Sequence, residues 1–215
     1  MNDKVGLGLT TASEASFDTF FIGENELALD RARHGERVWL FGERATGKSH
    51  VLHALAQETA DARYITEHPP NLDKDSTAPL LLIDDIDALS GNEESEYALF
   101  AVYEATDFAK TRWVVTAQSA PNEVSFLYRD LASRMSLFER VELRPVPESA
   151  RGSLLRFWAN DRSIGISDEV IQFLLDRIPR TQESLWDTLQ KLDRKSLLEN
   201  RTLTIPFVRE VMNFE

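Results

Sequence analysis

Short apolar runs alternate with longer stretches of helical periodicity through the first two thirds of the chain. Five runs are expected to form short buried strands: RVWLFG (37–42), RYIT (63–66), PLLLID (79–84), RWVVTAQ (112–118) and RVELR (140–144). The third and fourth are nearly continuous apolar runs, as in parallel strands buried on both faces. Helices are expected between them, in KSHVLHALAQETA (48–60), ESEYALFAVYEATDFAK (94–110) and SFLYRDLASRM (125–135). This alternation predicts a doubly wound α/β fold around a parallel sheet.

Two of these helices are expected to bury a defined face. In the helix over 94–110, the apolar residues of one face are Ala98, Val102 and Ala105. In the helix over 125–135, apolar residues recur every four positions, at Leu127, Leu131 and Met135. Arg134 directly precedes Met135, so we expect it at the edge of the buried face, free to project from the domain.

The last third of the chain contains helical patterns only. They cover 149–161, 167–178, 181–199 and 205–214 and follow the segment RPVPES (144–149), whose two prolines suit a domain boundary. Ser167 is expected to cap one helix, and Pro206 suits the first turn of another. We therefore predict a mobile N-terminal arm (1–14), an α/β base (15–147) and a small all-helical lid (148–215).

Composition and charge indicate which kinds of fold, cellular location and partner to expect. It has 215 residues with 42% hydrophobic content, enough for a sizeable core, and no cysteine, which excludes disulfides and thiolate metal sites. The start lacks the pattern of a secretion signal and the longest apolar runs are too short to span a membrane, so a cytoplasmic protein is expected. The net charge of −12 argues against sequence-blind binding of nucleic acid and favours protein partners.

The stretch FGERATGKSH (41–50) matches the phosphate-binding loop pattern Gly-x-x-x-x-Gly-Lys-[Ser/Thr]. It lies directly after a predicted strand and before a predicted helix, where backbone N–H groups and the helix N-terminus can converge on phosphate oxygens. Lys48 would contact the β- and γ-phosphates, and Ser49 would bind Mg²⁺. The alternative is a chance glycine-rich turn. The predicted nucleotide contacts from this stretch are Gly42, Glu43, Arg44, Ala45, Thr46, Gly47, Lys48, Ser49 and His50.

A second motif, LLLIDDID (80–87), ends an apolar strand in two carboxylates. Asp84 is the expected metal-shell residue, and Asp85 is expected to orient an attacking water. The alternative is an ordinary acidic turn, to which Asp87 is assigned. The four histidines are scattered along the chain, and His50 and His53 have no third ligand nearby in the sequence, so they are not expected to bind metal.

Six segments together resemble the DnaA-like family of AAA+ ATPases, most closely its Hda type: SFDTFFIGENELAL (16–29), GERATGKSHVLHALA (42–56), LLLIDDID (80–87), WVVTAQSAPNEV (113–124), LASRM (131–135) and RTLTIPFVREVM (201–212). The resemblance covers the chain from about residue 16 onward. It implies a P-loop AAA+ module, with a base built on a five-stranded sheet and followed by a helical lid. It also implies that the nucleotide base lies near Phe20, Phe21 and Ile22; ordinary apolar packing is the alternative for these three.

The chain departs from the family pattern at its two sensor positions. The resemblance places Gln118, an uncharged side chain, at the polar sensor that follows the fourth strand. A second sensor, normally an arginine, aligns with Glu183, and Arg180 lies one turn earlier; the sequence leaves open which of the two fills the position. If Glu183 replaces the arginine, the γ-phosphate loses one counter-charge, so bound ADP would be favoured over ATP and intrinsic ATP hydrolysis would be weak.

The resemblance implies a nucleotide-bound regulator of replication initiation. With the DNA-loaded sliding clamp, such a protein promotes hydrolysis of the ATP bound to DnaA and so prevents re-initiation. In this family an arginine reaches the nucleotide of a neighbouring subunit, and LASRM assigns that role to Arg134; a surface pair with Asp130 is the alternative. The alternative function is a self-contained P-loop ATPase such as a helicase loader.

The resemblance also implies how partners are recruited. GLGL (6–9) occupies the place of a clamp-binding peptide, with Leu7 and Leu9 as anchors, although the family's glutamine is missing and a functionless tail is the alternative. The sequence has no DNA-binding domain after VREVMNFE (208–215), so no direct sequence-specific DNA binding is expected. The sequence leaves homo-oligomerisation open.

Overall fold

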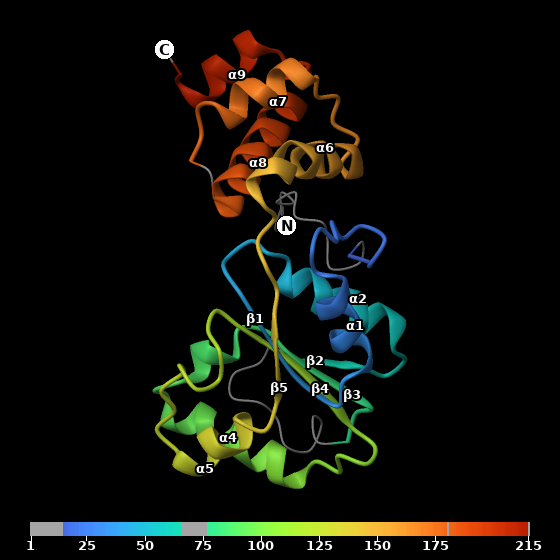
Figure 1. The fold of residues 1–215 in the computed structure, drawn as a ribbon, viewed down its shortest axis with the longest axis vertical. Coiled ribbons are helices and arrows are strands. Elements are labelled where there is room, and N and C mark those ends of the chain that lie inside the picture. The colour runs from blue at the N-terminus through green and yellow to red at the C-terminus, as the bar shows by residue number, and fades with distance from the viewer. Residues whose placement is uncertain (1–14, 66–76, 180, 215) are drawn as a thin grey trace, which may run out of the picture. The chain divides into compact units, whose positions relative to one another are not determined.

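The computed structural model describes residues 15–65, 77–179 and 181–214. The predictions for Leu7, Leu9 and Arg180 therefore concern residues outside the described ranges. The chain divides into two compact units between Arg144 and Pro145 (Figure 1). The first unit is an α/β domain and the second is entirely helical, and each is described by itself.

The first unit is built on a five-stranded parallel sheet with the order β2-β3-β4-β1-β5. This confirms the predicted sheet. The strands β3 and β4 are buried along almost their whole length, which explains their nearly continuous apolar sequences. Because all strands are parallel, their carboxyl ends meet at one edge of the sheet. The strands are β1 (Arg37–Phe41), β2 (Arg63–Ile65), β3 (Leu80–Ile83), β4 (Arg112–Ala117) and β5 (Glu139–Glu142).

Helices cover both faces of this sheet, and each face has its own apolar core. On one face α1 (Glu26–His34) and α2 (Lys48–Glu58) pack on side chains such as Leu40, Leu82 and Val114. On the other face α4 (Glu93–Ala105) and α5 (Arg129–Met135) cover Trp39, Ile83 and Trp113, and the short 3-10 helix η1 (Ile86–Leu89) follows β3. Figure 1 shows the two helical layers on opposite sides of the strands.

Both helices on the second face differ from their predicted extents. The helix α4 ends at Ala105 rather than at residue 110, because the Thr106 hydroxyl donates to the Val102 carbonyl and the backbone then becomes extended. Its buried face is formed by Leu99, Val102 and Tyr103, whereas Ala105 is exposed. The prediction for Ala105 was therefore wrong.

The helix α5 begins four residues later than predicted. The Tyr128 N–H donates to the carboxylate of Glu96, and the extended backbone at Tyr128 starts the helix at the next residue. Leu127 precedes the helix and is 59% exposed, so its assignment to the buried face was wrong. Leu131 and Met135 are fully buried as predicted.

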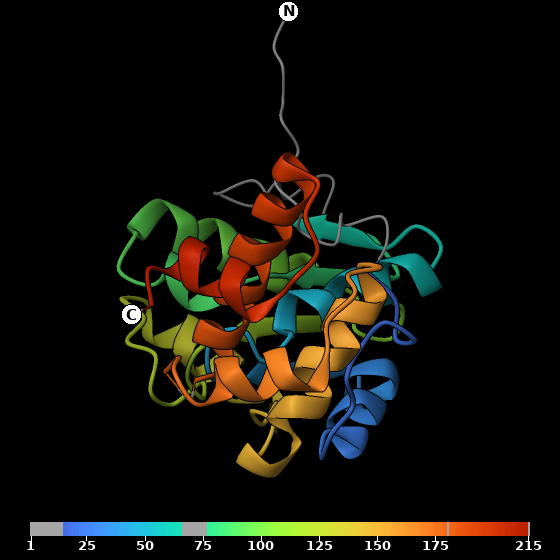
Figure 2. The same ribbon diagram turned by 90° about the horizontal axis from the view of Figure 1, so that it is seen from above.

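The second unit is a bundle of four helices preceded by a 3-10 turn, coloured gold to red in Figure 2. Three of the helices are capped by Ser167, Thr181 and Thr204, whose side chains accept the N–H three residues later. The bundle confirms the predicted helical lid. Its elements are η2 (Glu148–Ala150), α6 (Arg151–Asp161), α7 (Asp168–Leu175), α8 (Gln182–Glu199) and α9 (Ile205–Met212).

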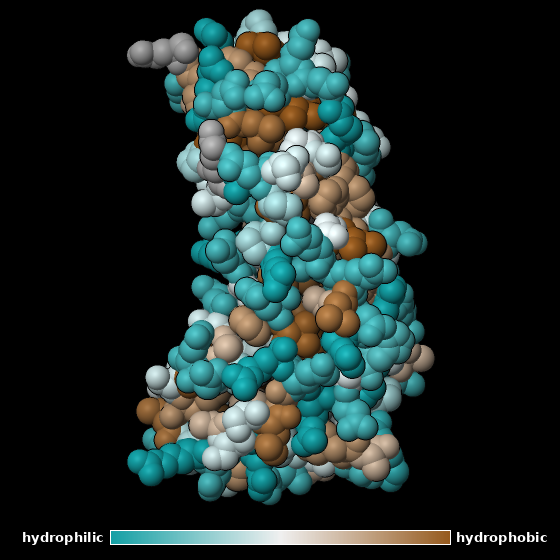
Figure 3. Space-filling model, viewed as in Figure 1, coloured by the Kyte–Doolittle hydropathy of each residue, from teal (hydrophilic) through white to brown (hydrophobic). Residues whose placement is uncertain are grey.

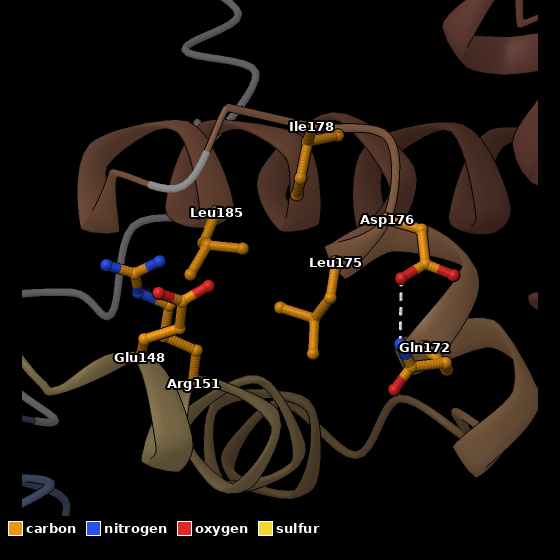
Figure 4. A pocket seen from close by; sticks show the side chains of 7 residues that line it. All are labelled: Glu148, Arg151, Gln172, Leu175, Asp176, Ile178 and Leu185. Carbon is orange, nitrogen blue, oxygen red and sulfur yellow. Dashed lines mark hydrogen bonds between the residues drawn. The ribbon is translucent and has the colours of Figure 1, made fainter.

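A cavity of about 160 Å³ lies within the lid (Figure 4). Apolar side chains of α7 and α8 line one part of it, and Gln172 donates to Asp176 at its other end with a distance of 2.8 Å. None of the described residues that the sequence assigns to nucleotide binding lines this cavity.

Hydrophilic residues cover most of the face seen in Figure 3, in keeping with the charged composition of the chain. Among the described residues, no helix combines the length and the apolar character that crossing a membrane requires.

Candidate functional site

The loop between β1 and α2 has a backbone that two glycines make possible. A Cβ atom at Gly42 would lie 2.3 Å from the carbonyl oxygen of Leu143. Gly47 has a φ of +99°, and a Cβ there would lie 2.5 Å from the ring of Phe20. Any other residue at Gly47 would thus meet both backbone strain and a collision with an aromatic ring. The two fixed glycines of the motif therefore each have a steric reason in this fold.

The first turn of α2 can receive an anion. The helix begins at Lys48 with Gly47 as its N-cap, and no side chain in the described structure caps it. The first N–H groups of a helix have no partner within the helix and carry the positive end of its dipole. A glycine loop that leads into such an uncapped helix is suited to hold phosphate oxygens.

Lys48 is the buried cation of this loop. Its side chain is buried, and its Nζ donates to the carbonyl oxygens of Gly42 at 2.8 Å and Glu43 at 2.9 Å. Burial lowers the pKa of Lys48, while the nearby carboxylates of Asp85 and Asp84 raise it. The ammonium group thus binds the glycine loop and interacts electrostatically with the acidic pair. Phosphate oxygens could replace the two carbonyls as its acceptors.

The acidic pair lies at the carboxyl end of β3. Tyr64 of β2 donates its hydroxyl to Asp84 Oδ2 at 2.8 Å, and Thr116 of β4 donates its hydroxyl to Asp84 Oδ1. The Asp85 N–H donates to the same Thr116 Oγ1 at 2.9 Å. Asp85 has a φ of +48°, an unusual value for a residue other than glycine. Three neighbouring strands therefore contribute to the placement of the two carboxylates.

Electrostatics distinguishes the groups around this pair. Desolvation, and next the charge of Asp84, raise the pKa of the Asp85 carboxyl, and Lys48 opposes this shift. Desolvation and the carboxylate of Asp84 also raise the pKa of Tyr64, so its hydroxyl keeps its proton and acts as a donor. The raised pKa of Asp85 makes its carboxyl better able to accept a proton, whereas Tyr64 serves as a hydrogen-bond donor to Asp84.

Sequence reasoning missed Tyr64 and Thr116. Thr116 is a polar, fully buried residue in the otherwise apolar stretch WVVTA, whereas Tyr64 is a half-buried residue of the short strand RYI. A polar side chain inside a buried strand needs a hydrogen-bond partner. The sequence therefore carried a signal for Thr116, because a hydroxyl interrupts an apolar strand there. The identity of the partner depends on the strand order β2-β3-β4, which places both residues beside β3.

The segment before α1 lies against the glycine loop. Phe20 is buried, and its ring meets Gly47 and makes an edge contact with His50, with 5.6 Å between the ring centroids. The Nε2 of His50 lies 2.7 Å from the Ser16 carbonyl oxygen. Phe21 is half-buried and Ile22 is 46% exposed. The structure therefore brings Phe20 and His50 to the loop.

Other predicted site residues lie at the edges of this region. Ser49 is exposed on the first turn of α2. Gln118 is exposed directly after β4, and its backbone N–H donates to Asp87 Oδ2 at 2.9 Å. Asp87 was assigned to an ordinary solvated turn; in the structure it links this turn to the end of β4.

A magnesium ion fits the chemistry of these residues only with further ligands. The hydroxyl of Ser49 and the carboxylate of Asp84 are oxygen ligands of the kind that Mg²⁺ prefers. The described part of the chain contains no group of three or more histidine, aspartate or glutamate side chains able to hold a metal alone. A metal that takes one or two protein ligands and completes its shell with phosphates and water matches that donor set.

Arg134 lies in the last turn of α5, and its side chain is 44% exposed. Its Nε donates to Glu104 Oε1 of α4 at 3.0 Å, rather than pairing with Asp130. In the lid, Glu183 lies in the first turn of α8.

Comparisons with known proteins agree with this architecture. Residues 148–212 match the family model described as "Hda, lid domain". Domain III of the Thermotoga maritima replication initiation protein DnaA aligns with a TM-score of 0.76 and 20% identity over 93% of this chain and 96% of that one. AMPPCP-bound DnaA from Aquifex aeolicus aligns with a TM-score of 0.68 and 18% identity over 86% and 69%.

A protein other than DnaA also has a similar structure. The Thermotoga maritima RuvB Holliday junction branch migration motor aligns with a TM-score of 0.67 and 18% identity over 94% of this chain and 72% of that one. At such identities the likeness shows the fold, which is the AAA+ P-loop fold with a helical lid. The family match is confined to the lid, over residues 148–212, and the solved structures show the fold of the chain as a whole.

Proposed function

We propose that this chain is a DnaA-related regulator of replication initiation that binds ADP or ATP with Mg²⁺ and promotes hydrolysis of ATP held by DnaA. The DNA-loaded sliding clamp is its proposed second partner. The observation that carries the proposal is the match of residues 148–212 to the Hda lid, on a chain whose whole fold is similar to a DnaA AAA+ domain.

The nucleotide site of the proposal is the glycine loop with the acidic pair. The N-terminal N–H groups of α2 and the Lys48 ammonium would bind the phosphates, and Phe20, packed on Gly47, would lie beside them. Ser49 and Asp84 would hold Mg²⁺, which neutralises phosphate charge when bound. Asp85, whose pKa is raised, would orient water or accept its proton. One solved DnaA structure similar to this chain is AMPPCP-bound, which supports the choice of a nucleotide.

Intrinsic hydrolysis is proposed to be weak. Glu183 occupies the first turn of α8, where a helix favours a negative side chain and where the family resemblance places an arginine sensor. If Glu183 rather than Arg180 fills that position, its carboxylate cannot neutralise the γ-phosphate. The chain would therefore act mainly on the nucleotide of its partner.

Arg134 is proposed to be the group that acts on the partner. It lies at the end of α5 with its side chain partly exposed, and it forms an ion pair with the exposed carboxylate of Glu104. A guanidinium stays charged and can place several donors on the oxygens of a transferring phosphoryl group. An arginine supplied in trans accelerates such reactions by roughly 10³–10⁵.

The self-contained ATPase remains the competing function because Lys48, Asp84 and Asp85 are all present and lie together. One turnover assay separates the two functions. The protein is assayed alone, then with ATP-loaded DnaA, with and without DNA-loaded clamp. The regulator hydrolyses little ATP alone and accelerates hydrolysis on DnaA; rapid turnover alone with no effect on DnaA would favour the ATPase, of which a helicase loader is one example.

A further inference from the structure

The carboxylate of Asp84 is held at both of its oxygens by hydroxyl groups from the two strands that flank β3. We propose that Tyr64 and Thr116 are positioning residues that fix Asp84 for the Mg²⁺ of a bound nucleotide. This inference rests on the proposed nucleotide site and adds two residues to it. Neither residue belongs to the glycine loop or to the acidic motif.

Tyr64 is itself held by a second contact, on the face of its ring. Its ring stacks on the imidazole of His53, with 4.6 Å between centroids and 6° between ring planes. His53 lies on α2, the helix that begins at Lys48. The stacked contact fixes the plane of the Tyr64 ring, and the ring fixes the direction from which its hydroxyl reaches Asp84 Oδ2.

Thr116 joins the two carboxylate residues through one oxygen atom. Its hydroxyl has a single proton, which is donated to Asp84 Oδ1, and its oxygen accepts the N–H of Asp85. Thr116 is fully buried in β4, so this hydroxyl has little freedom to turn toward water. The arrangement fixes the side chain of Asp84 and the backbone turn at Asp85 together.

The two hydrogen bonds leave the carboxylate able to bind more. A carboxylate has about four acceptor positions, of which Tyr64 and Thr116 use one on each oxygen. The remaining positions can face a metal ion or a water bound to it. Partners that orient a metal-binding carboxylate typically change metal affinity by about 10–100-fold when removed.

A structural role alone would have a different signature. If Tyr64 only stabilised β2, its loss would weaken the fold and would lower nucleotide affinity equally with and without metal. A positioning role predicts that the metal-dependent part of nucleotide binding is lost while the metal-free part is kept. The ratio of ADP affinity in Mg²⁺ to ADP affinity in EDTA, called here the magnesium advantage, distinguishes the two.

The experiment measures the magnesium advantage of the full chain and of Tyr64→Phe by calorimetry. Mn²⁺ binding in the presence of ADP, followed by electron paramagnetic resonance, gives a second readout that does not depend on hydrolysis. Tyr64→Phe is expected to lower the magnesium advantage by about 10-fold or more and to leave ADP affinity in EDTA within about twofold. Tyr128→Phe is the matched control, because it removes a hydroxyl that contacts the exposed carboxylate of Glu93.

Thr116 provides an independent pair of variants in case Tyr64→Phe does not fold. Thr116→Ser keeps the hydroxyl and should keep the magnesium advantage, whereas Thr116→Val removes the hydroxyl and should lose it. An unchanged magnesium advantage in Tyr64→Phe or Thr116→Val, or an equal loss of ADP affinity with and without metal, overturns the inference. If the parent protein binds no nucleotide in either condition, the proposed function fails as well.

Discussion

Arg134 and Glu104 join the ends of two helices, because the Nε of Arg134 at the end of α5 donates to Glu104 Oε1 at the end of α4 over 3.0 Å. Both side chains are almost half exposed, at 44% and 46%. Exposed ion pairs contribute only about 0–1 kcal/mol, so this one can be exchanged for a stronger anion at little cost. In the proposed function, that anion would be the phosphoryl group of the partner's nucleotide.

The first prediction is that Arg134→Ala removes stimulation of ATP hydrolysis by DnaA in the presence of DNA-loaded clamp. The loss is expected to be on the order of 10³ or more in rate. Unfolding free energy should change by less than about 1 kcal/mol, since an exposed pair is removed. The affinity of the protein for its own nucleotide should stay unchanged.

Glu104→Gln is the matched control, because it breaks the same ion pair and keeps the arginine. It should stimulate DnaA as well as the parent protein does. Equal stimulation by Arg134→Ala and the parent protein would show that Arg134 is not the group acting in trans. The regulator proposal would then lack its chemical centre.

A second prediction concerns Lys48, the buried cation of the glycine loop. Lys48→Ala should abolish ADP binding measured by calorimetry, because the loop then has no ammonium group for the phosphates. Two loop carbonyls also lose their donor, so a modest loss of stability, of about 1–3 kcal/mol, is expected and should be checked by thermal unfolding. Lys110→Ala, which removes an exposed lysine paired with Asp107, should bind ADP normally. Undiminished ADP binding by Lys48→Ala would contradict the assignment of the site.

The sheet and the acidic pair were predictable because their signals are local. Buried parallel strands are apolar along their length, and a glycine loop between a strand and a helix repeats one backbone geometry. The signal that sets the start of α5 is not local to that helix. That start is determined by Glu96, a fully buried carboxylate that accepts the N–H groups of Gly91 and Tyr128, and no pattern within 125–135 indicates that partner. The helix α1 was not predicted at all.

To predict the contacts of Tyr64 and Thr116 one also needs to know which distant segments become neighbours in the fold. Each lies in a different strand from Asp84, and the strands become neighbours only in the folded order. Sequence reasoning identified the carboxylates and missed the groups that hold them. It placed Arg134 at the edge of the buried face of its helix. It assigned the alternative ion-pair partner of Arg134 to Asp130 of the same helix, whereas the partner in the structure is Glu104 of α4.

A third prediction concerns the N-terminal segment GLGL. If Leu7 and Leu9 anchor the chain in a groove of the sliding clamp, the double substitution Leu7→Ala/Leu9→Ala should abolish clamp binding. Each leucine contributes only about 1.5–3 kcal/mol when fully buried, so the parent affinity should be weak. Surface plasmon resonance on DNA-loaded clamp measures both proteins. Failure of the parent protein to bind the clamp would remove this recruitment mechanism.

The last prediction separates two reasons for glycine in the phosphate loop. Gly47 and Gly91 both have positive φ, +99° and +82°, but a Cβ at Gly47 would lie 2.5 Å from the Phe20 ring, whereas a Cβ at Gly91 would have no neighbour within 4 Å. Gly91→Ala therefore measures backbone strain alone, about 1–3 kcal/mol of unfolding free energy. Gly47→Ala should cost more.

The Phe20 ring must move in Gly47→Ala, and the loop that it packs on moves with it, so nucleotide binding should also be lost. Denaturant unfolding of both variants gives the two stability costs, and calorimetry with ADP gives the two affinities. Gly91→Ala is expected to bind ADP as the parent protein does, because Gly91 lies in the turn after η1, outside the glycine loop. Equal stability costs and intact ADP binding in both variants would show that the contact between Phe20 and the glycine loop has no part in shaping the site.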